Sequence, residues 1–123
     1  MKNTILVTAL FAALSLTACS KPEPLHDSME SMEDSYKSLK KAETLEDKKQ
    51  LVADFEKYLL IAKEQKVRPE DQKTFDEGIE KLSQEVQALK LQLEQGNIEN
   101  IKPQLKRLHD LEEEYHELLG VEE

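Results

Sequence analysis

Four stretches of the chain repeat one pattern, in which an apolar residue returns every three or four positions. This spacing places the apolar side chains on one stripe of an α-helix, and each stripe needs a partner surface to bury it. The pattern therefore predicts an all-α fold. The residues expected to face inward are Leu25, Met29, Met32, Tyr36 and Leu39 in the first helix; Leu51, Val52, Phe55, Tyr58, Leu59 and Ala62 in the second; Phe75, Ile79, Leu82, Val86, Leu89 and Leu93 in the third; and Ile98, Ile101, Leu105, Leu108, Leu111, Tyr115, Leu118 and Leu119 in the fourth.

Residues that start and stop helices separate the four stretches. Thr44 is a good N-cap for the second helix, which we expect to run to about Lys66. Pro69 fits the first turn of the third helix, and Gly96 is expected to end it in a left-handed conformation. The connections are short, so successive helices run antiparallel, and the chain predicts an up-down-up-down four-helix bundle over residues 25–120.

The start of the fourth helix has two possible readings. Pro103 falls in the second helical turn if Asn97 is the N-cap. It falls in the first turn if Asn100 is the cap, and proline is tolerated there because the first N–H groups have no helical partner. In both readings the helix reaches Leu119.

The balance of charges limits the partners. The 26 acidic and 17 basic residues give a formal net charge of −9, which repels nucleic acid and anionic lipid headgroups. Such a charge favours basic protein partners, or it serves solubility alone. The chain also contains no nucleophile elbow or phosphate loop, and we expect no catalytic activity.

The first 24 residues resemble an export segment. Lys2 precedes an apolar run from Ile5 to Leu16, which is shorter than the roughly 20 residues that span a bilayer. The sequence then reads Leu-Thr-Ala-Cys, similar to the lipobox of bacterial lipoproteins. That resemblance implies a signal peptide over residues 1–18, lipidation of Cys19 and a tether over residues 19–24. Ser20 favours the outer membrane, and the alternative is ordinary signal cleavage that leaves a free thiol.

One end of the predicted bundle gathers residues that suit a metal centre. The start of the first helix and the end of the fourth share this end, together with the start of the third. From the rise of 1.5 Å per residue, Met29, Phe75 and His116 lie at about the same depth, roughly 6–9 Å inside it. A thioether and an imidazole then face each other across the bundle, an arrangement that suits a haem iron.

Several short patterns resemble those of the cytochrome b562 family, the exported four-helix-bundle cytochromes. They are Leu25-x-Asp27-x-Met29-Glu30-x-x-x-Asp34, Ala42, Phe75-x-x-Gly78, Glu94-x-Gly96, Gln104-Leu105-Lys106 and Tyr115-His116. The resemblance extends over about residues 25–119. The methionine near the start and the Tyr-His pair near the end are its specific part.

The resemblance implies a periplasmic electron-transfer protein with one non-covalent haem b. Met29 and His116 would be the axial ligands of the iron. The chain contains no Cys-x-x-Cys-His motif, which excludes the usual covalent attachment. Gly78 would allow a close approach of the macrocycle. The further residues that match pocket positions of the family are Met32, Phe55, Phe75 and Ile79.

The chain departs from the family at two positions that are basic in the family. Glu112 stands one turn before the expected histidine ligand, and Gly120 stands near the C-terminus. Both changes remove positive charge that could balance the haem propionates. Glu112 would also stabilise oxidised iron and lower the reduction potential.

Two other functions remain open. The first is a haem-free helical lipoprotein with a structural or adaptor role in the cell envelope. The second is a copper or zinc carrier that uses His26, Met29, Met32 and His116, because imidazole and thioether ligands suit Cu(I). His109 is expected to be a solvated surface residue. A lipid on Cys19 would turn the His116 end towards the membrane, so we expect a membrane-associated redox partner.

Overall fold

The computed structural model describes residues 23–120, and within them the chain forms four α-helices joined by short connections. The predicted signal peptide, Cys19 and most of the tether lie outside the described residues. No helix in the described part is long and apolar enough to cross a membrane. In chain order, the elements are α2 (Glu23–Lys41), α3 (Leu45–Lys63), α4 (Pro69–Glu94), the short 3₁₀ helix η2 (Glu99–Ile101) and α5 (Lys102–Leu119).

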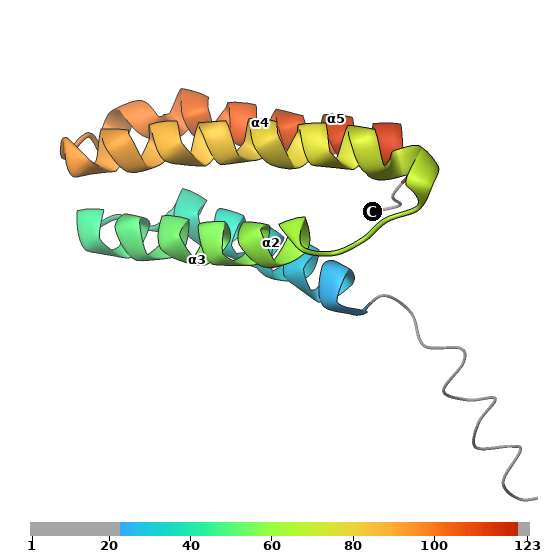
Figure 1. The fold of residues 1–123 in the computed structure, drawn as a ribbon. Coiled ribbons are helices and arrows are strands. Elements are labelled where there is room, and N and C mark those ends of the chain that lie inside the picture. Colours follow the sequence, from blue (N-terminus) through green and yellow to red (C-terminus); the bar gives the residue numbers. More distant parts are fainter. Residues whose placement is uncertain (1–22, 121–123) are drawn as a thin grey trace, which may run out of the picture.

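The helices form an antiparallel up-down-up-down bundle, as the sequence predicted. Figure 1 shows two hairpins, α2 with α3 and α4 with α5, stacked on each other and joined by the connection between α3 and α4. The start of α2, the end of α3, the start of α4 and the end of α5 therefore share one end of the bundle. We call this the open end, because a cavity lies there, and we call the opposite end the closed end.

Capping residues fix most of the boundaries. The Thr44 hydroxyl accepts a hydrogen bond from the backbone N–H of Asp47 at 3.1 Å, which confirms it as the N-cap of α3. Pro69 begins α4, and Gly96 follows its end with a φ of 79°. On the surface of α4, Glu77 and Lys81 form an ion pair across one helical turn, at 3.4 Å.

Three boundaries differ from the sequence prediction. α3 ends at Lys63 rather than near Lys66, because its last turn tightens, with the N–H of Glu64 bonded to the carbonyl of Ile61 at 3.2 Å. α2 begins at Glu23, so the last two residues of the predicted tether are helical. Pro103 does lie in the first turn of α5, but the residues before that turn form η2 instead of an asparagine cap.

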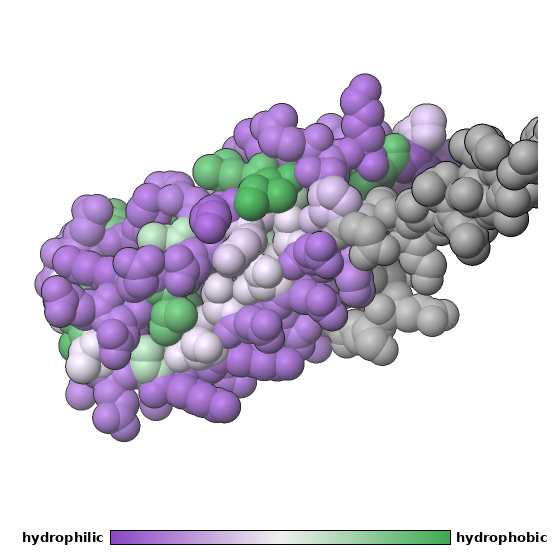
Figure 2. All heavy atoms as spheres, turned by 90° about the horizontal axis from the view of Figure 1, so that it is seen from below, coloured by the Kyte–Doolittle hydropathy of each residue, from purple (hydrophilic) through white to green (hydrophobic). Residues whose placement is uncertain are grey.

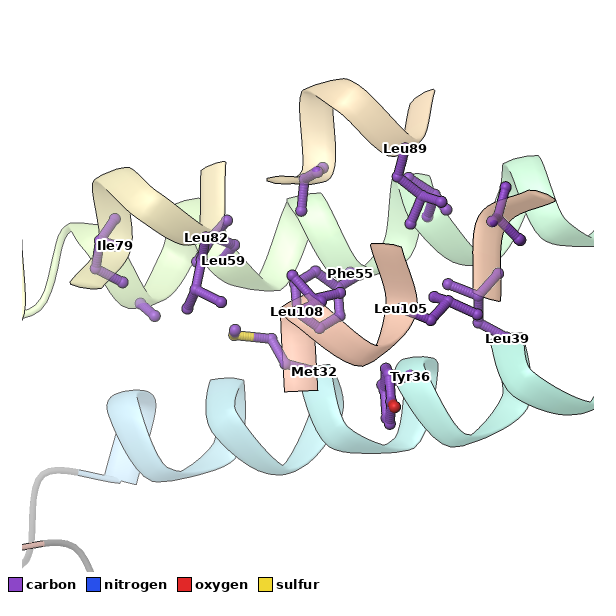
Figure 3. Close-up of a cluster of buried hydrophobic side chains, with 14 of the residues drawn as sticks. Met32, Tyr36, Leu39, Phe55, Leu59, Ile79, Leu82, Leu89, Leu105 and Leu108 are labelled. Atoms are coloured by element: carbon purple, nitrogen blue, oxygen red, sulfur yellow. The ribbon is translucent and has the colours of Figure 1, made fainter. Parts of the chain in front are cut away.

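The apolar stripes meet in one core that runs along the bundle. Figure 3 shows side chains from all four helices in it, with Met32 and Tyr36 from α2 opposite Leu105 and Leu108 from α5. Leu118 is an error of the sequence prediction: it is 60% exposed, whereas Leu119 packs against the core. Since Leu119 lies four residues after buried Tyr115, it continues the stripe, and Leu118 turns out of it.

The surface outside this core is largely hydrophilic. Figure 2 shows mostly hydrophilic residues on the face seen there, interrupted by small groups of apolar ones. The large apolar side chains that the described part of the chain exposes are Leu60, Ile61, Leu91 and Leu118.

Candidate functional site

A cavity of about 540 Å³ lies at the open end, between the first half of α2 and the second half of α5. It is present because α2 and α5 approach each other less closely than α2 and α3, α3 and α4, or α4 and α5 do. Its volume falls within the range of roughly 300–1,000 Å³ that is typical of sites for small molecules and cofactors. The end of α3 and the first half of α4 supply the remaining walls.

Met29 and His116 both line this cavity, from opposite helices. Both side chains are half-buried. Met29 lies in the second turn of α2, and His116 lies in the last turn of α5, four residues before Gly120. Gly120 ends that helix in a left-handed conformation with a φ of 71°. The bundle therefore brings a thioether and an imidazole to one cavity, as the sequence predicted from their depth.

Three of the four predicted pocket residues also line the cavity. Met32, Phe75 and Ile79 are buried and form its apolar wall. Figure 3 shows the Met32 side chain extending between α2 and the opposite helices, with Ile79 nearer the start of α2. Phe55 does not line the cavity; it is only 1% exposed and belongs to the core beyond Met32.

A contact between α2 and α5 that the sequence did not predict lies in the lining of the cavity. The rings of Tyr36 and His109 are stacked, with centroids 5.4 Å apart and planes 28° apart. His109 Nε2 lies 3.6 Å from an oxygen of Glu113 on the next turn. The side chain of His109 is 42% exposed, so it lies partly in solvent as predicted, but it also lines the cavity. It lies seven residues before His116, and this heptad spacing, which places both on one face of α5, was the available signal.

His109 also belongs to a group of possible metal ligands. The group consists of one ligand atom from each of three residues, His109, Asp110 and Glu113, and these atoms lie within 4.8 Å of one another. However, Lys106 donates a hydrogen bond to Asp110 at 2.9 Å, and both carboxylates are exposed. The group is accounted for as a network of ion pairs along α5.

Gly78 makes a close contact with α5 that the sequence did not predict. A Cβ atom at this position would lie 2.8 Å from two ring atoms of Tyr115, closer than such contacts occur. Gly78 therefore allows the Tyr115 ring to pack on α4, beside the cavity, and its helical backbone is otherwise ordinary. Lys81, one turn further along α4, places its ammonium 5.4 Å from the centre of the same ring. Because His116 follows Tyr115 in the chain, this packing also fixes the part of α5 that carries His116.

The lining of the cavity carries both signs of charge, with the acidic groups in excess. Lys37 lies 2.8 Å from Glu33, to which it donates a hydrogen bond, and this contact lowers the pKa of the Glu33 carboxyl. His116 and His109 contribute to this lowering at longer range. Lys40 places its ammonium 5.5 Å from the centre of the Tyr36 ring. Lys37 and Lys40 are the two lysines in the lining of the cavity, and the carboxylate residues of the lining carry the opposite charge.

The two departures from the family pattern differ in their surroundings. Glu112 is half-buried and lines the cavity, so its carboxylate acts directly on the groups there. The pKa of the Tyr36 phenol is raised, chiefly by burial and to a smaller extent by the negative charges of Glu112, Asp110 and Glu113. Gly120 is exposed and serves to end α5.

His26 completes the set of histidines. All three histidines of the chain line the cavity, as do both methionines of the bundle. His26 is the most exposed of them, at the outer edge, and its Nε2 lies 3.5 Å from Glu30 on the next turn.

A comparison with protein-family models matched residues 24–119 to the model for cytochrome b562. The chain belongs to the cytochrome b562 family. The match extends over the whole bundle, from the first turn of α2 to the last residue of α5. Comparisons with curated proteins and with solved structures gave no significant match. Membership indicates a haem-binding electron carrier, from a family that is typically periplasmic and not enzymatic.

The residues of the cavity fit a haem group. Its walls are apolar at the inner end, where Met32, Phe75 and Ile79 would contact a flat macrocycle. A thioether and an imidazole from opposite helices are the two donor types that hold a low-spin iron. Lys37 and Lys40 supply positive charge for carboxylate substituents.

Proposed function

We propose that this protein is an electron carrier that binds one non-covalent haem b in the cavity between α2 and α5, with Met29 and His116 as the axial ligands. The observation that carries the proposal is the position of these two residues on opposite walls of one apolar cavity in a member of the cytochrome b562 family. The matching residue types and depth support the assignment of each to one face of the haem.

A haem bound here would supply an iron that takes up and gives back one electron. Met29 and His116 would hold this iron through a thioether and an imidazole, which would leave no position for a further ligand and would suit electron transfer. The thioether favours the reduced form and raises the reduction potential. Glu112, which lines the same cavity, favours the oxidised form and lowers the potential.

The rest of the cavity would position the group and exclude water. Met32, Phe75 and Ile79 contribute the apolar wall, and their burial limits water at the inner end. The Tyr36–His109 stack joins the two helices that carry the ligands. Lys37 and Lys40, the two lysines in the lining, would pair with the propionates.

The test is to reconstitute the purified protein with haem and to record its reduced absorption spectrum. We expect a low-spin spectrum that is lost in Met29→Ala and in His116→Ala. Met32→Leu and His26→Ala are matched controls, because they change the same residue types in the lining of the same cavity and should keep the spectrum. If the Met29 and His116 variants both retain an unchanged low-spin spectrum, the ligand assignment is wrong.

The cellular location forms a second part of the proposal. We infer that the protein is a periplasmic lipoprotein, anchored through Cys19 to a bacterial membrane, with the outer membrane favoured by Ser20. The mass of detergent-extracted protein should include acyl chains, and Cys19→Ser should release the protein from membranes. A mass that matches an unmodified Cys19 thiol would contradict this.

Anchoring would also select the redox partner. Residues 19–22 join the proposed anchor to the start of α2, so the open end would lie near the membrane and pass electrons to a membrane-associated partner. Lengthening this segment should slow the reduction of the haem-loaded protein by membranes. An unchanged rate would argue against a membrane-associated partner.

One observation favours a second candidate function. The cavity gathers more soft donors than a haem requires, because His26, Met29 and Met32 follow one another at intervals of three on α2. Thioether and imidazole ligands select Cu(I). Metal analysis of protein from its own host distinguishes the two candidates: stoichiometric copper without haem would replace the first proposal.

A further inference from the structure

The net charge of the protein is confined to two half-helices. Residues 23–39 contain five acidic residues and one lysine, and residues 108–120 contain five acidic residues and no lysine or arginine. Their formal charges are −4 and −5, with histidines neutral, which together give −9. Residues 40–107 contain fourteen acidic and fourteen basic residues and are neutral as a group. The described part of the chain is therefore strongly polarised.

The two acidic half-helices lie beside each other at the open end. Their acidic residues lie between positions 23 and 34 of α2 and between positions 110 and 117 of α5, along the parts of these helices that flank the cavity. The stacked rings of Tyr36 and His109 mark where they meet. The pKa of Tyr36 on α2 is raised first by burial and then by Glu112, Asp110 and Glu113 on α5, so the α5 carboxylates act across this boundary.

The acidic groups are available to a partner. Eight of the acidic residues are exposed, and Glu112 is half-buried. The exposed residues are Asp27, Glu30, Glu33, Asp34, Asp110, Glu113, Glu114 and Glu117. Lys37 is the only lysine or arginine within these two half-helices, and it is paired with Glu33.

Apolar groups lie at the centre of this acidic surface. Leu25, Met29 and Leu119 are half-buried in the lining of the cavity. An apolar centre within a charged rim is the usual composition of a protein interface. The entrance of the cavity therefore combines a small apolar contact with a strong field of one sign.

We propose that the cavity entrance, formed by residues 25–37 of α2 and 109–119 of α5, is the docking surface for a protein partner with a basic patch. This inference rests on the proposed function, for which the partner would exchange electrons with the bound haem. A second copy of this chain does not fit, because two faces of charge −9 repel each other. Anionic lipid headgroups are excluded by the same repulsion.

The charge distribution would act mainly on the rate of encounter. A field concentrated at one end turns the molecule so that the cavity entrance meets a cationic partner first, and it raises the association rate at low ionic strength. Salt should weaken the complex strongly, because the Debye length falls from about 10 Å at 0.1 M to about 3 Å at 1 M. Electron-transfer complexes are small and short-lived, which suits a contact that rests on such forces.

The experiment uses cytochrome c, a basic electron-transfer protein, as the probe, and measures its binding to the purified protein by calorimetry and by amide NMR. At low salt, we expect the chemical-shift changes to concentrate on residues 25–37 and 109–119. The variant Glu30→Lys/Glu113→Lys should raise the Kd about ten-fold or more. In the matched control Glu46→Lys/Glu94→Lys, both substitutions lie on exposed residues at the closed end, and the Kd should change less than about two-fold.

Equal weakening by both double variants would overturn the proposal, because it would show that only total charge matters. Shift changes that centre on Leu60, Ile61 or Leu91 would overturn it in favour of apolar docking elsewhere. The assay reads binding and can be run with and without haem. A protein that fails to bind haem but still binds the probe at the entrance would refute the proposed function alone, and a haem-loaded protein that binds elsewhere would refute the docking surface alone.

Discussion

The two ends of the bundle are built from the same apolar repeat, yet they differ in packing and in charge. At the closed end, Leu39, Leu89, Leu93 and Ile101 are at most 1% exposed. There, even Lys48 is buried, and its ammonium donates a hydrogen bond to the carbonyl of Leu39 at 3.4 Å. At the open end, the corresponding positions Leu25 and Met29 are half-buried beside a cavity. The open end also carries the net charge.

The difference separates stability from function within a single helical repeat. Side chains that are fully buried at the closed end contribute the hydrophobic free energy that holds the helices together. The open end leaves part of the same apolar stripe without a protein partner, and a cofactor can supply the missing contacts there. We therefore expect substitutions to have different consequences at the two ends.

The largest expected effect comes from truncating the closed end. Leu89→Ala should lower the free energy of unfolding of the haem-free protein by about 2–5 kcal/mol, since it leaves a cavity in a packed core. Met29→Leu, at the open end, should change it by less than about 1.5 kcal/mol and can be stabilising, because a volume-conserving replacement has little packing to disturb. Urea unfolding followed by circular dichroism measures both. Equal losses would show that the two ends are packed alike.

A smaller effect is expected where α4 and α5 meet beside the cavity. Gly78→Ala brings a Cβ to 2.8 Å from the Tyr115 ring, and such overpacking costs about 1–3 kcal/mol. The higher helix propensity of alanine offsets about 1 kcal/mol of this, so the net change should be a loss of up to about 2 kcal/mol.

The double variant Gly78→Ala/Tyr115→Leu provides the control for that prediction. If the ring contact is the cause, alanine at position 78 should be neutral or stabilising relative to Tyr115→Leu alone. A loss of similar size in both backgrounds would mean that Gly78 is required for another reason, such as a close approach of the haem. Chemical unfolding of the native protein, the two single variants and the double variant provides the four free energies of this double-mutant cycle.

The smallest effect concerns the pH dependence that the acidic half-helices produce. The pKa of Tyr36 is raised in the folded protein by burial and by Glu112, Asp110 and Glu113. As the pH rises above about 10, the ordinary value for tyrosine, the phenol ionises first in the unfolded chain, so this contribution to stability is lost. Tyr36→Phe should therefore lose less stability than the native protein between about pH 9 and 11.

Tyr58→Phe is the matched control, because Tyr58 is a half-buried tyrosine on α3 outside the cavity. Stability curves measured against pH should differ from the native curve for Tyr36→Phe more than for Tyr58→Phe. The opposite order would contradict the assigned influence of the α5 carboxylates. The lysines with raised pKa values, such as Lys37 and Lys106, are shared by all three proteins and do not affect the comparison.

The sequence predicted the bundle because the evidence for it is local. Apolar spacing sets each helical stripe, and Thr44, Pro69 and Gly96 set the boundaries that the structure confirms. The common depth of Met29 and His116 followed from helical rise and chain direction alone, and both line one cavity. Contacts between helices were harder to predict, because they depend on the rotation and separation of neighbours.

The Tyr36–His109 stack and the fit of Tyr115 on Gly78 are such contacts. Neither residue pair is close in sequence, and a tyrosine on an apolar stripe is ordinary core material. Leu118 and Leu119 show the same limit within one helix, since a stripe at a helix end can continue through either residue. The uneven distribution of charge is visible in the sequence. A docking surface can be inferred from it only once the structure shows that the two acidic segments flank one cavity.

The most direct test of the account is a haem titration of the purified haem-free protein, followed by Soret absorbance and the reduced spectrum. We predict saturation at one haem per chain with a low-spin spectrum in the native protein, and loss of that spectrum in both Met29→Ala and His116→Ala. No saturable binding by the native protein, or identical low-spin spectra in all three proteins, would contradict the assignment of the open end as a haem site.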